Sequence, residues 1–570
     1  MPSVHSLLFN SLAVLCAGSV FQALAAPDST RLFDHQQQHQ QAQQEAREAQ
    51  LAPQTPGVRL DADTVPEVNG PFPSETPCFP ITSVVLSGKQ AFPHWVPLSR
   101  IANGGVGHCL GIKGINQLIS RLQNNLIEHG WVTSRVLAPE QDLRSGTLQL
   151  TLFPGKVRAV RYKEGADSRA IITTAMPVKE GDLLDLRDIE QGLENLQRLP
   201  TVEASMELVP GDLSGESDIV IARKQSRLWH TSVWVDDSGT KSTGRTQGGV
   251  MLALDNPLAL SDLFYISAGH DLGFQGKKQS TSLNAHYSLP WGYWLFDMTG
   301  GRSNYVQSIA GLNGDIRYSG QSKNLNTGLS RVIQRGSNSK TTLRYGVLYR
   351  ETRNYINDTE LDIQRRRTSA WQLGLSHRHY LGAATLDAGV SYQRGTRWFG
   401  AMPAWEEQNP EGDYATALSK ILTWNASLNL PFALANQQFR YQVSWLRQTS
   451  STPLTPQDQF SIGNRWTVRG FDGERSLSAN HGWYVQNTLA WQTPLPQQEF
   501  YLGADYGEVG GRADGFALLG RHLAGAVSGL RGNISRTGIG YDLFAGIPLS
   551  KPSGFRTDPV TLGFSVNWQY

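Results

Sequence analysis

Residues 422–430 read L-T-W-N-A-S-L-N-L, and this pattern decides the fold. Apolar side chains at every second position alternate with Thr, Asn or Ser. A period of two places the apolar groups on one face of an extended strand and the polar groups on the other. Stretches 343–349, 439–445 and 539–547 repeat the pattern. A soluble β-sandwich alternates in the same way, so alternation alone leaves two folds open.

The end of the chain separates these two folds. It alternates apolar and aromatic residues at Leu562, Phe564, Val566, Trp568 and Tyr570. This ending resembles the last strand of outer-membrane barrels, so Phe564, Trp568 and Tyr570 are predicted to form a membrane-insertion signal. Residues 227–570 have room for about sixteen strands, the size at which a barrel encloses an aqueous channel.

Composition excludes several functions. The chain has 570 residues and a net charge of only +2, so no global positive field favours nucleic acid. It contains no G-x-S-x-G, Walker-type or H-E-x-x-H motif, which argues against hydrolase, nucleotide-driven or zinc-protease chemistry. We therefore expect that the protein is not an enzyme and that it has no catalytic residue, cofactor or metal.

The N-terminus predicts export. Residues 7–23 are mainly apolar and are followed by Ala23-Leu24-Ala25, which fits a signal peptide over 1–25. Cys16 would leave with it. The two remaining cysteines, Cys78 and Cys109, are then expected to form a disulfide, because exported chains fold in oxidising compartments.

Two unusual segments follow the signal peptide. Residues 36–50 contain eight Gln, and 28–50 is predicted to form a helix that is polar all round, suited to a water-filled lumen. A disordered Gln-rich tract is the alternative. His35 and His39 lie one helical turn apart and could share a metal, although such pairs are usually solvated. Residues 51–77 contain six prolines and read as an extended linker.

Residues 78–154 and 155–226 repeat one pattern of strand, helix, helix, strand, strand. Apolar residues at helical spacing predict the main helices at 114–129 and 186–199. The strands expected in the first module are 81–86, 131–137 and 147–153. Those expected in the second are 157–162, 202–208 and 219–222.

Several motifs in this region carry a family resemblance. They are Cys78-Phe79-Pro80-Ile81, Gly130-Trp131-Val132-Thr133, Gly146-Thr147-Leu148 and, far downstream, Val468-Arg469-Gly470-Phe471. Together they resemble two-partner secretion transporters, the haemolysin activator and filamentous-adhesin exporter type. The resemblance implies a mainly β fold, in which a transmembrane antiparallel barrel follows two periplasmic POTRA (polypeptide-transport-associated) domains and an N-terminal plug helix.

The resemblance also implies a lock inside the barrel. In the family, the Arg of a V-R-G-F loop pairs with the Asp of a G-x-D-x-G strand. Here these are Arg469 and Asp505, the latter in G-A-D-Y-G at 503–507. Val468, Gly470 and Phe471 complete the loop tip. The residues alone leave other pairings open, through Arg465, Asp472 and Glu474.

The function implied is export of one large unfolded β-helical exoprotein through the bacterial outer membrane, with the POTRA domains in the periplasm. The cargo would be a haemolysin, an adhesin or a contact-dependent toxin, and the transporter could also activate it. Other partners implied are outer-membrane lipid and the barrel-assembly machinery. A barrel-assembly insertase and a plugged diffusion porin are the alternatives. We expect cargo to bind a free sheet edge formed by Val202, Glu203, Ala204, Ser205, Met206, Glu207 and Leu208.

Overall fold

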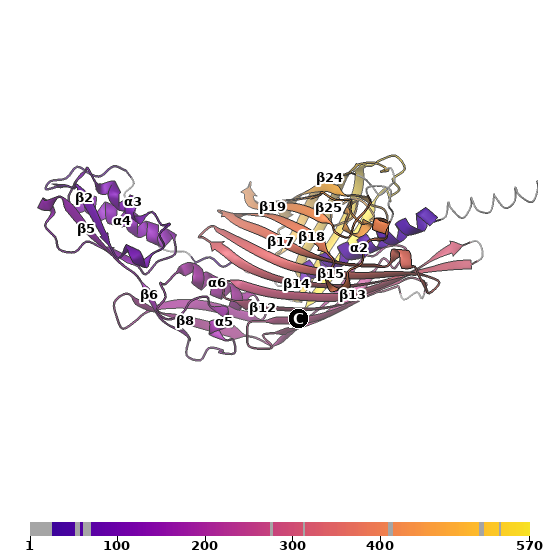
Figure 1. Ribbon diagram of the computed structural model, residues 1–570, viewed down its shortest axis with the longest axis horizontal. Helices are drawn as coiled ribbons and strands as arrows, with labels where there is room; N and C mark the ends of the chain where they lie inside the picture. Colours follow the sequence, from indigo (N-terminus) through magenta and orange to yellow (C-terminus); the bar gives the residue numbers. More distant parts are fainter. Residues whose placement is uncertain are drawn as a thin grey trace, which may run out of the picture.

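The computed structural model describes residues 26–51, 57–60, 70–273, 277–311, 314–408, 414–511, 518–534 and 537–570. Figure 1 shows two small α/β modules at one end of a long β-barrel, with a helix running inside the barrel. The predicted signal peptide and most of the linker lie outside the described residues. None of the described helices is long and apolar enough to cross a membrane.

The first module is a three-stranded sheet covered by a long helix. Its elements are β1 (Phe79–Pro80), β2 (Ser83–Ser87), α3 (Leu98–Ala102), β3 (Cys109–Leu110), α4 (Ile112–Glu128), β4 (Arg135–Leu137) and β5 (Thr147–Phe153). The sheet order is β2-β5-β4, with β2 parallel to β5. Leu118, Leu122 and Leu126 of α4 are fully buried, as their helical spacing predicts. The Cys78–Cys109 disulfide is confirmed, with Cα atoms 5.3 Å apart.

The prediction of a strand over 131–137 is only half right, because the strand begins at Arg135. Gly130 ends the helix with φ +102°, and the N–H of Ser134 then closes a turn on the carbonyl of Trp131 at 3.2 Å. Trp131 is 3% exposed and contacts Phe92 edge to face. The Trp131 indole is therefore part of the hydrophobic core, although the residue stands in a turn.

The second module repeats this architecture. Its elements are β6 (Lys156–Tyr162), α5 (Ile172–Ala175), α6 (Leu186–Gln197), β7 (Val202–Pro210) and β8 (Glu216–Gln225). The sheet order is β6-β8-β7, with β6 parallel and β7 antiparallel to β8. Strand β7 is therefore an edge strand. The short helix α5 has only four residues.

The remaining described chain forms a closed barrel of sixteen antiparallel strands. They are β9 (Trp229–Asp236), β10 (Gln247–Asp255), β11 (Leu263–Asp271), β12 (Gln279–Trp291), β13 (Trp294–Gly311), β14 (Gly314–Arg335), β15 (Ser339–Ile356), β17 (Arg366–Leu381), β18 (Ala384–Thr396), β19 (Lys420–Leu434), β20 (Gln437–Ser450), β23 (His481–Gln492), β24 (Gln498–Gly510), β25 (His522–Ile534), β26 (Ile539–Ser550) and β27 (Thr561–Gln569). The two-residue strand β16 (Thr359–Glu360) pairs antiparallel with the end of β15 and is not counted among the sixteen.

The barrel closes where β27 pairs with β9, from Ser565↔Asp236 to Gln569↔Ser232. Alternation gives the wall two different faces, as predicted. Leu252 and Leu543 point outward and are exposed, whereas Ser267, Asn284 and Ser303 line a cavity inside. The confirmed fold is therefore an apolar-outside, polar-inside barrel.

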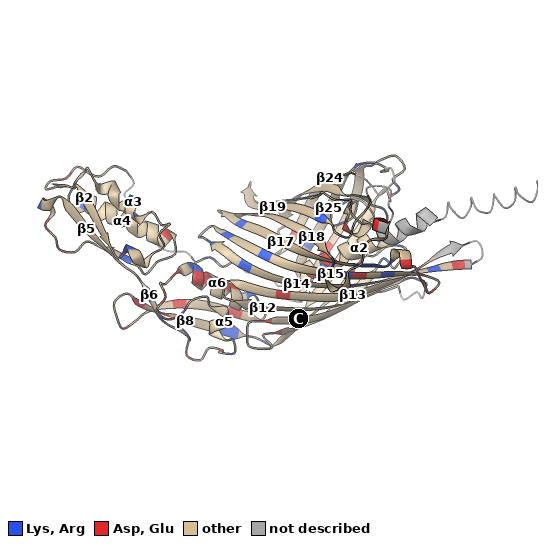
Figure 2. Ribbon diagram, in the orientation of Figure 1, with Lys and Arg blue, Asp and Glu red and all other residues tan. Residues whose placement is uncertain are grey.

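Buried charges join the second module to the barrel. Figure 2 shows acidic residues on α6 beside the barrel. Lys340 Nζ lies 2.6 Å from Glu194, and Arg335 binds both Glu194 and Glu190. Both glutamates are only 1% exposed. Each buried carboxylate thus has a cationic partner, which a dry interface requires.

A partly buried carboxyl group, Asp188, also lies at this junction. The Tyr293 hydroxyl, in the turn between β12 and β13, donates to Asp188 of α6 at 2.5 Å. Burial, with the charges of Asp185 and Asp182, raises the pKa of Asp188 to about 7. The folded state thus keeps a proton that the unfolded chain releases near pH 4.

We expect the junction to weaken as pH rises from about 4 to about 7. The stability that Asp188 contributes is full below its unfolded pKa and is lost as pH rises through its folded one. Hydrogen exchange of the α6 amides, corrected for intrinsic rates, should show falling protection over that interval. Asp188→Asn, which mimics the protonated acid, should flatten the profile. An equally steep profile in Asp188→Asn would contradict this assignment.

Candidate functional site in the barrel lumen

The connection between β20 and β23 folds back into the barrel instead of projecting outward. A short hairpin of β21 (Phe460–Ile462) and β22 (Leu477–Ala479) forms its base. The tip carries the V-R-G-F tetrapeptide. Gly470 adopts φ +100° there, which only glycine tolerates without strain. The tip can therefore turn sharply against the wall.

Arg469 and Asp505 meet at this tip. The guanidinium donates from Nε to Oδ2 and from Nη2 to Oδ1 of Asp505, both at 2.7 Å. The backbone N–H of Arg469 also donates to Asp505, at 2.9 Å. Nη2 further reaches the carbonyl of Asn487 and the hydroxyl of Thr488. The Asp505 side chain is completely buried, so the pair is a bidentate, desolvated anchor.

Glycines on three adjacent strands let the tip approach the wall. A Cβ at Gly525 of β25 would lie 1.9 Å from the carbonyl oxygen of Arg469. At Gly503 of β24 it would lie 2.7 Å from the guanidinium, and at Gly546 of β26 2.8 Å from the Cα of Gly470. Larger residues there would push the tip away, so the missing side chains are part of the site.

Apolar residues hold the tip beside the ion pair. Val468 and Phe471 are 0% and 3% exposed, in a cluster that includes Val509 and Leu523. The Phe471 ring meets Phe555 edge to face, with centroids 5.8 Å apart. The loop therefore has its own small hydrophobic core inside a polar lumen.

The alternative partners have other contacts. Arg465 donates to Asp237 at 2.7 Å. Asp472 accepts from the backbone N–H of Asp558 at 3.1 Å, and Glu474 from that of Lys241 at 2.7 Å. The Asp237 carboxylate also accepts from the N–H of Phe564 at 2.9 Å. Asp237 thus ties the loop to the seam between β9 and β27, beyond the last main-chain pair.

Helix α2 (Ala26–Leu51), predicted over 28–50, fills much of the remaining lumen. Its glutamines bind polar groups around them. Gln36 donates to Thr243 at 3.1 Å and Gln43 to Ser238 at 2.7 Å, both in the connection between β9 and β10. Gln44 donates to Asn284 and Asn324 of the wall, each at 3.1 Å. Arg47 forms an ion pair with Asp236 and lies over the Trp234 ring. A helix without an apolar stripe thus satisfies its side chains inside a polar channel.

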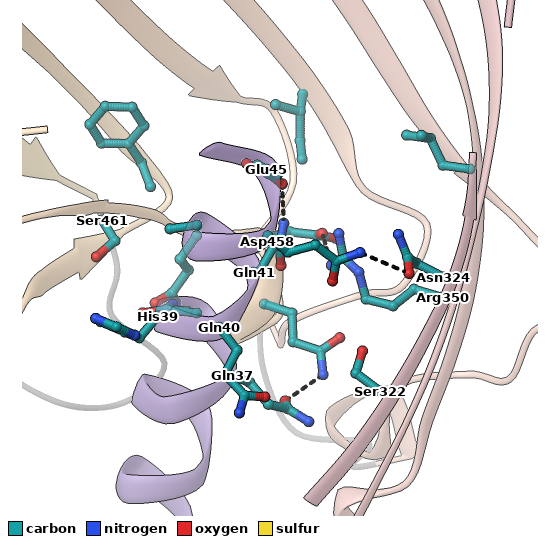
Figure 3. Close-up of a pocket in the computed structure, with 18 of the residues that line it drawn as sticks. Gln37, His39, Gln40, Gln41, Glu45, Ser322, Asn324, Arg350, Asp458 and Ser461 are labelled. Carbon is teal, nitrogen blue, oxygen red and sulfur yellow. Dashed lines mark hydrogen bonds and ion pairs between the residues drawn. The ribbon is translucent and has the colours of Figure 1, made fainter. Parts of the chain in front are cut away.

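The helix also touches the inward loop, and a cavity of about 710 Å³ lies beside both. Figure 3 shows Gln37, Gln40 and Gln41 facing this cavity, opposite Asn324 and Arg350 of the wall. His39 meets the Trp466 ring with centroids 5.5 Å apart. Among the described residues, no three His, Cys, Asp or Glu gather as a metal site would need. The lumen is therefore a polar passage closed by a helix and a loop.

Sequence reasoning missed Asp236 and Asp237. These consecutive acids end β9 and receive Arg47 and Arg465, the cations of the helix and of the loop. The only signal in the sequence was a pair of consecutive acids within the region 227–570, which was predicted to form strands. That pair does not show which distant arginine it receives.

Strand β7 begins at the barrel mouth. Val202 and Leu199 pack in one cluster with Trp234 and Met251 of the barrel. Backbone groups of alternate residues point to opposite sides in an antiparallel pair. Because the N–H of Val202 bonds the carbonyl of Leu199, outside the sheet, those of Ala204, Met206 and Leu208 also point away from β8. The amides of Glu203, Ser205 and Glu207 face β8.

The chain end lies at the same mouth. Tyr570 exchanges two backbone hydrogen bonds with Thr231, at 2.9 and 3.3 Å. Arg227 lies over the Tyr570 ring, and the Trp568 indole donates to the carbonyl of Thr537 at 2.9 Å. Phe564 stands further along β27. Their use as an insertion signal stays a prediction.

A polar-lined barrel that holds a helix in its lumen, with edge-bearing α/β modules at its mouth, defines an outer-membrane transporter for polypeptides. Residues 215–532 match the family described as "Haemolysin secretion/activation protein ShlB/FhaC/HecB". Residues 79–155 match a "POTRA domain, ShlB-type" and 156–210 a "POTRA domain". The chain belongs to this family of two-partner secretion transporters, and its POTRA modules lie in the periplasm.

Relatives cover almost the whole chain. "Outer membrane transporter CdiB-2" of Burkholderia pseudomallei (strain 1026b) is 37% identical over 94% of both chains. "Hemolysin transporter protein HpmB" of Proteus mirabilis is 26% identical over 76% of both. The solved structure "CdiB from Escherichia coli" is 29% identical, with a TM-score of 0.82 over 95% of this chain and 98% of that one. These matches favour the transporter over the insertase and porin alternatives.

The lock predicts a specific pattern of secretion defects. Arg469→Ala leaves a buried carboxylate unpaired, which costs about 3–5 kcal/mol in a dry site and less beside water. Asp505→Ala should be at least as damaging, since it also removes the acceptor of the Arg469 N–H. Arg469→Lys should rescue export only in part, because lysine lacks the two-pronged donor.

A double-mutant cycle on export, at equal barrel levels, measures this coupling. Non-additive losses in Arg469→Ala and Asp505→Ala are expected. Simple addition of the two losses would show that the pair does not act as one unit.

Removing the helix should open the channel. A variant lacking 28–50 should show a several-fold higher single-channel conductance in planar bilayers, because α2 and its side chains occupy the lumen. The matched control replaces Gln36, Gln43 and Arg47 by alanine, which weakens the wall contacts but keeps the helix. The conductance of this control should fluctuate between the level of the wild type and that of the deletion variant. Unchanged conductance in the deletion would contradict the plug assignment.

Proposed function

We propose that this transporter takes one large unfolded exoprotein from the periplasm and passes it through the barrel to the cell surface. The observation that carries this proposal is the placement of β7: a sheet edge begins at the mouth of a plugged, polar-lined barrel. The Ala204 carbonyl on this edge accepts from Gln197 of α6 at 2.6 Å, so the edge is open beyond Ala204. An extended segment can add to such an edge by main-chain pairing. It would then lie in line with the channel entrance.

The cargo is proposed to be of the kind that CdiB transporters export. Four CdiB relatives match 87–98% of this chain at 30–37% identity, whereas two haemolysin transporters match 76–78% at 26%. A large β-helical exoprotein suits the proposal, because its folding outside the cell would give the transport direction. Activation of the cargo stays a prediction.

The proposed role includes no catalysed reaction. Export through a channel breaks no covalent bond, and the lumen offers hydrogen-bonding side chains that an unfolded polar backbone can slide past. The exposed apolar band would contact outer-membrane lipid. The barrel-assembly machinery would insert the barrel through Phe564, Trp568 and Tyr570.

Proline substitutions in β7 can test the edge hypothesis. Ser205→Pro would be a poor choice, because the N–H of Ser205 faces β8 and holds the sheet together. Leu208→Pro instead removes an outward-pointing donor. Cargo binding to the full-length transporter should weaken about 3- to 10-fold, as expected for one lost main-chain hydrogen bond. Leu208→Ala is the matched control, since it loses the side chain but keeps the N–H. Equal binding by the two folded variants would exclude β7 as the docking edge.

A further inference from the structure

Part of the linker is not a free tether. Residues 70–77 lie along the first POTRA module and meet it at the N-terminal half of α4. Phe72 and Glu75 are each half-buried there, and Pro71, Ser74 and Thr76 are exposed. The segment is thus held by two side chains and by its backbone, in the manner of a bound peptide.

The Glu75 carboxylate occupies a built site at the start of α4. Oε1 accepts from the backbone N–H groups of Gly111 and Gly114, at 2.8 and 2.7 Å. Oε2 accepts from that of Lys113 at 2.9 Å. Three unpaired amides of a helix N-terminus therefore converge on one carboxylate, where the helix dipole also favours a negative charge.

The glycines of this site make room for the carboxylate. A Cβ at Gly111 would lie 2.5 Å from the Glu75 side chain and 2.6 Å from the carbonyl oxygen of Pro77. A Cβ at Gly114 would lie 2.9 Å from the Leu110 side chain and 3.1 Å from Oε1 of Glu75. The two glycines therefore leave room for the linker and its carboxylate, and Gly114 also leaves room for Leu110 of the core.

A second subsite recognises the aromatic residue. The Phe72 ring lies 5.0 Å from the His108 ring and 4.9 Å beneath the Arg121 guanidinium. The carbonyl of Gly70 accepts from Arg121 at 2.6 Å and from Gln117 at 3.0 Å. These contacts form a groove for an extended segment with an aromatic residue three positions before a carboxylate.

The module does not depend on this occupant for its core. All its fully buried apolar residues, from Ile81 to Leu152, follow the linker in sequence, and Phe72 touches only their margin. The Cys78–Cys109 disulfide joins the C-terminal end of the segment to the module, because Cys78 follows residues 70–77 and Cys109 stands two residues before Gly111. The linker is therefore a tethered ligand, present at an effective concentration on the order of millimolar.

We propose that this groove is a peptide-binding site that the linker occupies as an internal ligand until a segment of the exoprotein replaces it. The segment would be extended and would carry an aromatic residue and a carboxylate three residues apart, as Phe72 and Glu75 do. The proposal rests on the export function for its ligand and on the groove geometry for its site. Binding here would hold cargo close to the β7 edge, so that two weak contacts act together.

The test uses full-length transporter in nanodiscs and a fluorescent peptide of linker residues 70–76, G-P-F-P-S-E-T. Phe72→Ala/Glu75→Gln releases the internal ligand. This variant should bind the peptide at least tenfold more tightly than the wild type, because an occupied groove lowers the apparent affinity in proportion. A peptide with Gln in place of Glu should bind at least tenfold more weakly.

Two further variants separate the groove from general charge. Added to the released variant, Arg121→Ala should weaken peptide binding at least tenfold. Lys89→Ala, which removes one positive charge from the same module outside the groove, should not change it. Failure of the released variant to bind the peptide, or equal binding of the Gln peptide, would overturn the groove.

Export assays test the ligand separately. Arg121→Ala alone should slow export of the exoprotein, and Phe72→Ala/Glu75→Gln should speed its capture when cargo is scarce. Normal export by Arg121→Ala would overturn the claim that cargo uses the groove. Export by the wild type would meanwhile still stand as evidence for the transporter function.

Discussion

The structure depends on one constraint: within a membrane, every backbone N–H and C=O must be paired inside the protein. Sixteen strands meet it by closing on themselves. A barrel of that size leaves a wide polar lumen, so an outer-membrane protein that must not leak has to fill it. The helix and the inward loop fill the lumen with glutamines, arginines and one small apolar cluster.

Charge on the wall positions both fillers. Asp505 holds the loop tip, Asp237 holds its flank, and Asp236 holds the helix. All three carboxylates are nearly buried. A buried carboxylate that lost its cation would carry a large desolvation cost. If the helix or the loop moved away, its carboxylate would therefore need hydration by water or a new cationic partner, such as a basic residue of a passing polypeptide.

The sequence predicted what depends on local pattern. Period-two alternation gave the strands, and helical spacing in Leu118, Leu122 and Leu126 gave α4. The family resemblance, through the G-x-D-x-G motif, implied the wall strand that carries Asp505, and the glycines of that motif permit close approach. Contacts between residues far apart in sequence could not be predicted: the sequence around Asp236 and Asp237 does not indicate that they pair with Arg47 and Arg465. Likewise, the amides of β7 that face outward are determined by its pairing with β8. Trp131 lies in a turn before β4, and not in a strand as predicted, because its ring packs into the core.

The glycine-lined wall has a consequence for how such a loop tolerates change. Gly503, Gly525 and Gly546 contribute nothing but space, and a methyl group at any of them would displace the tip as surely as loss of its arginine. The position of the loop tip thus depends on the shape of the wall as well as on the ion pair, and that shape is set by residues of other strands. If the same loop were transplanted into a barrel with alanines at these wall positions, the loop tip would not fit against the wall, even though its arginine was present.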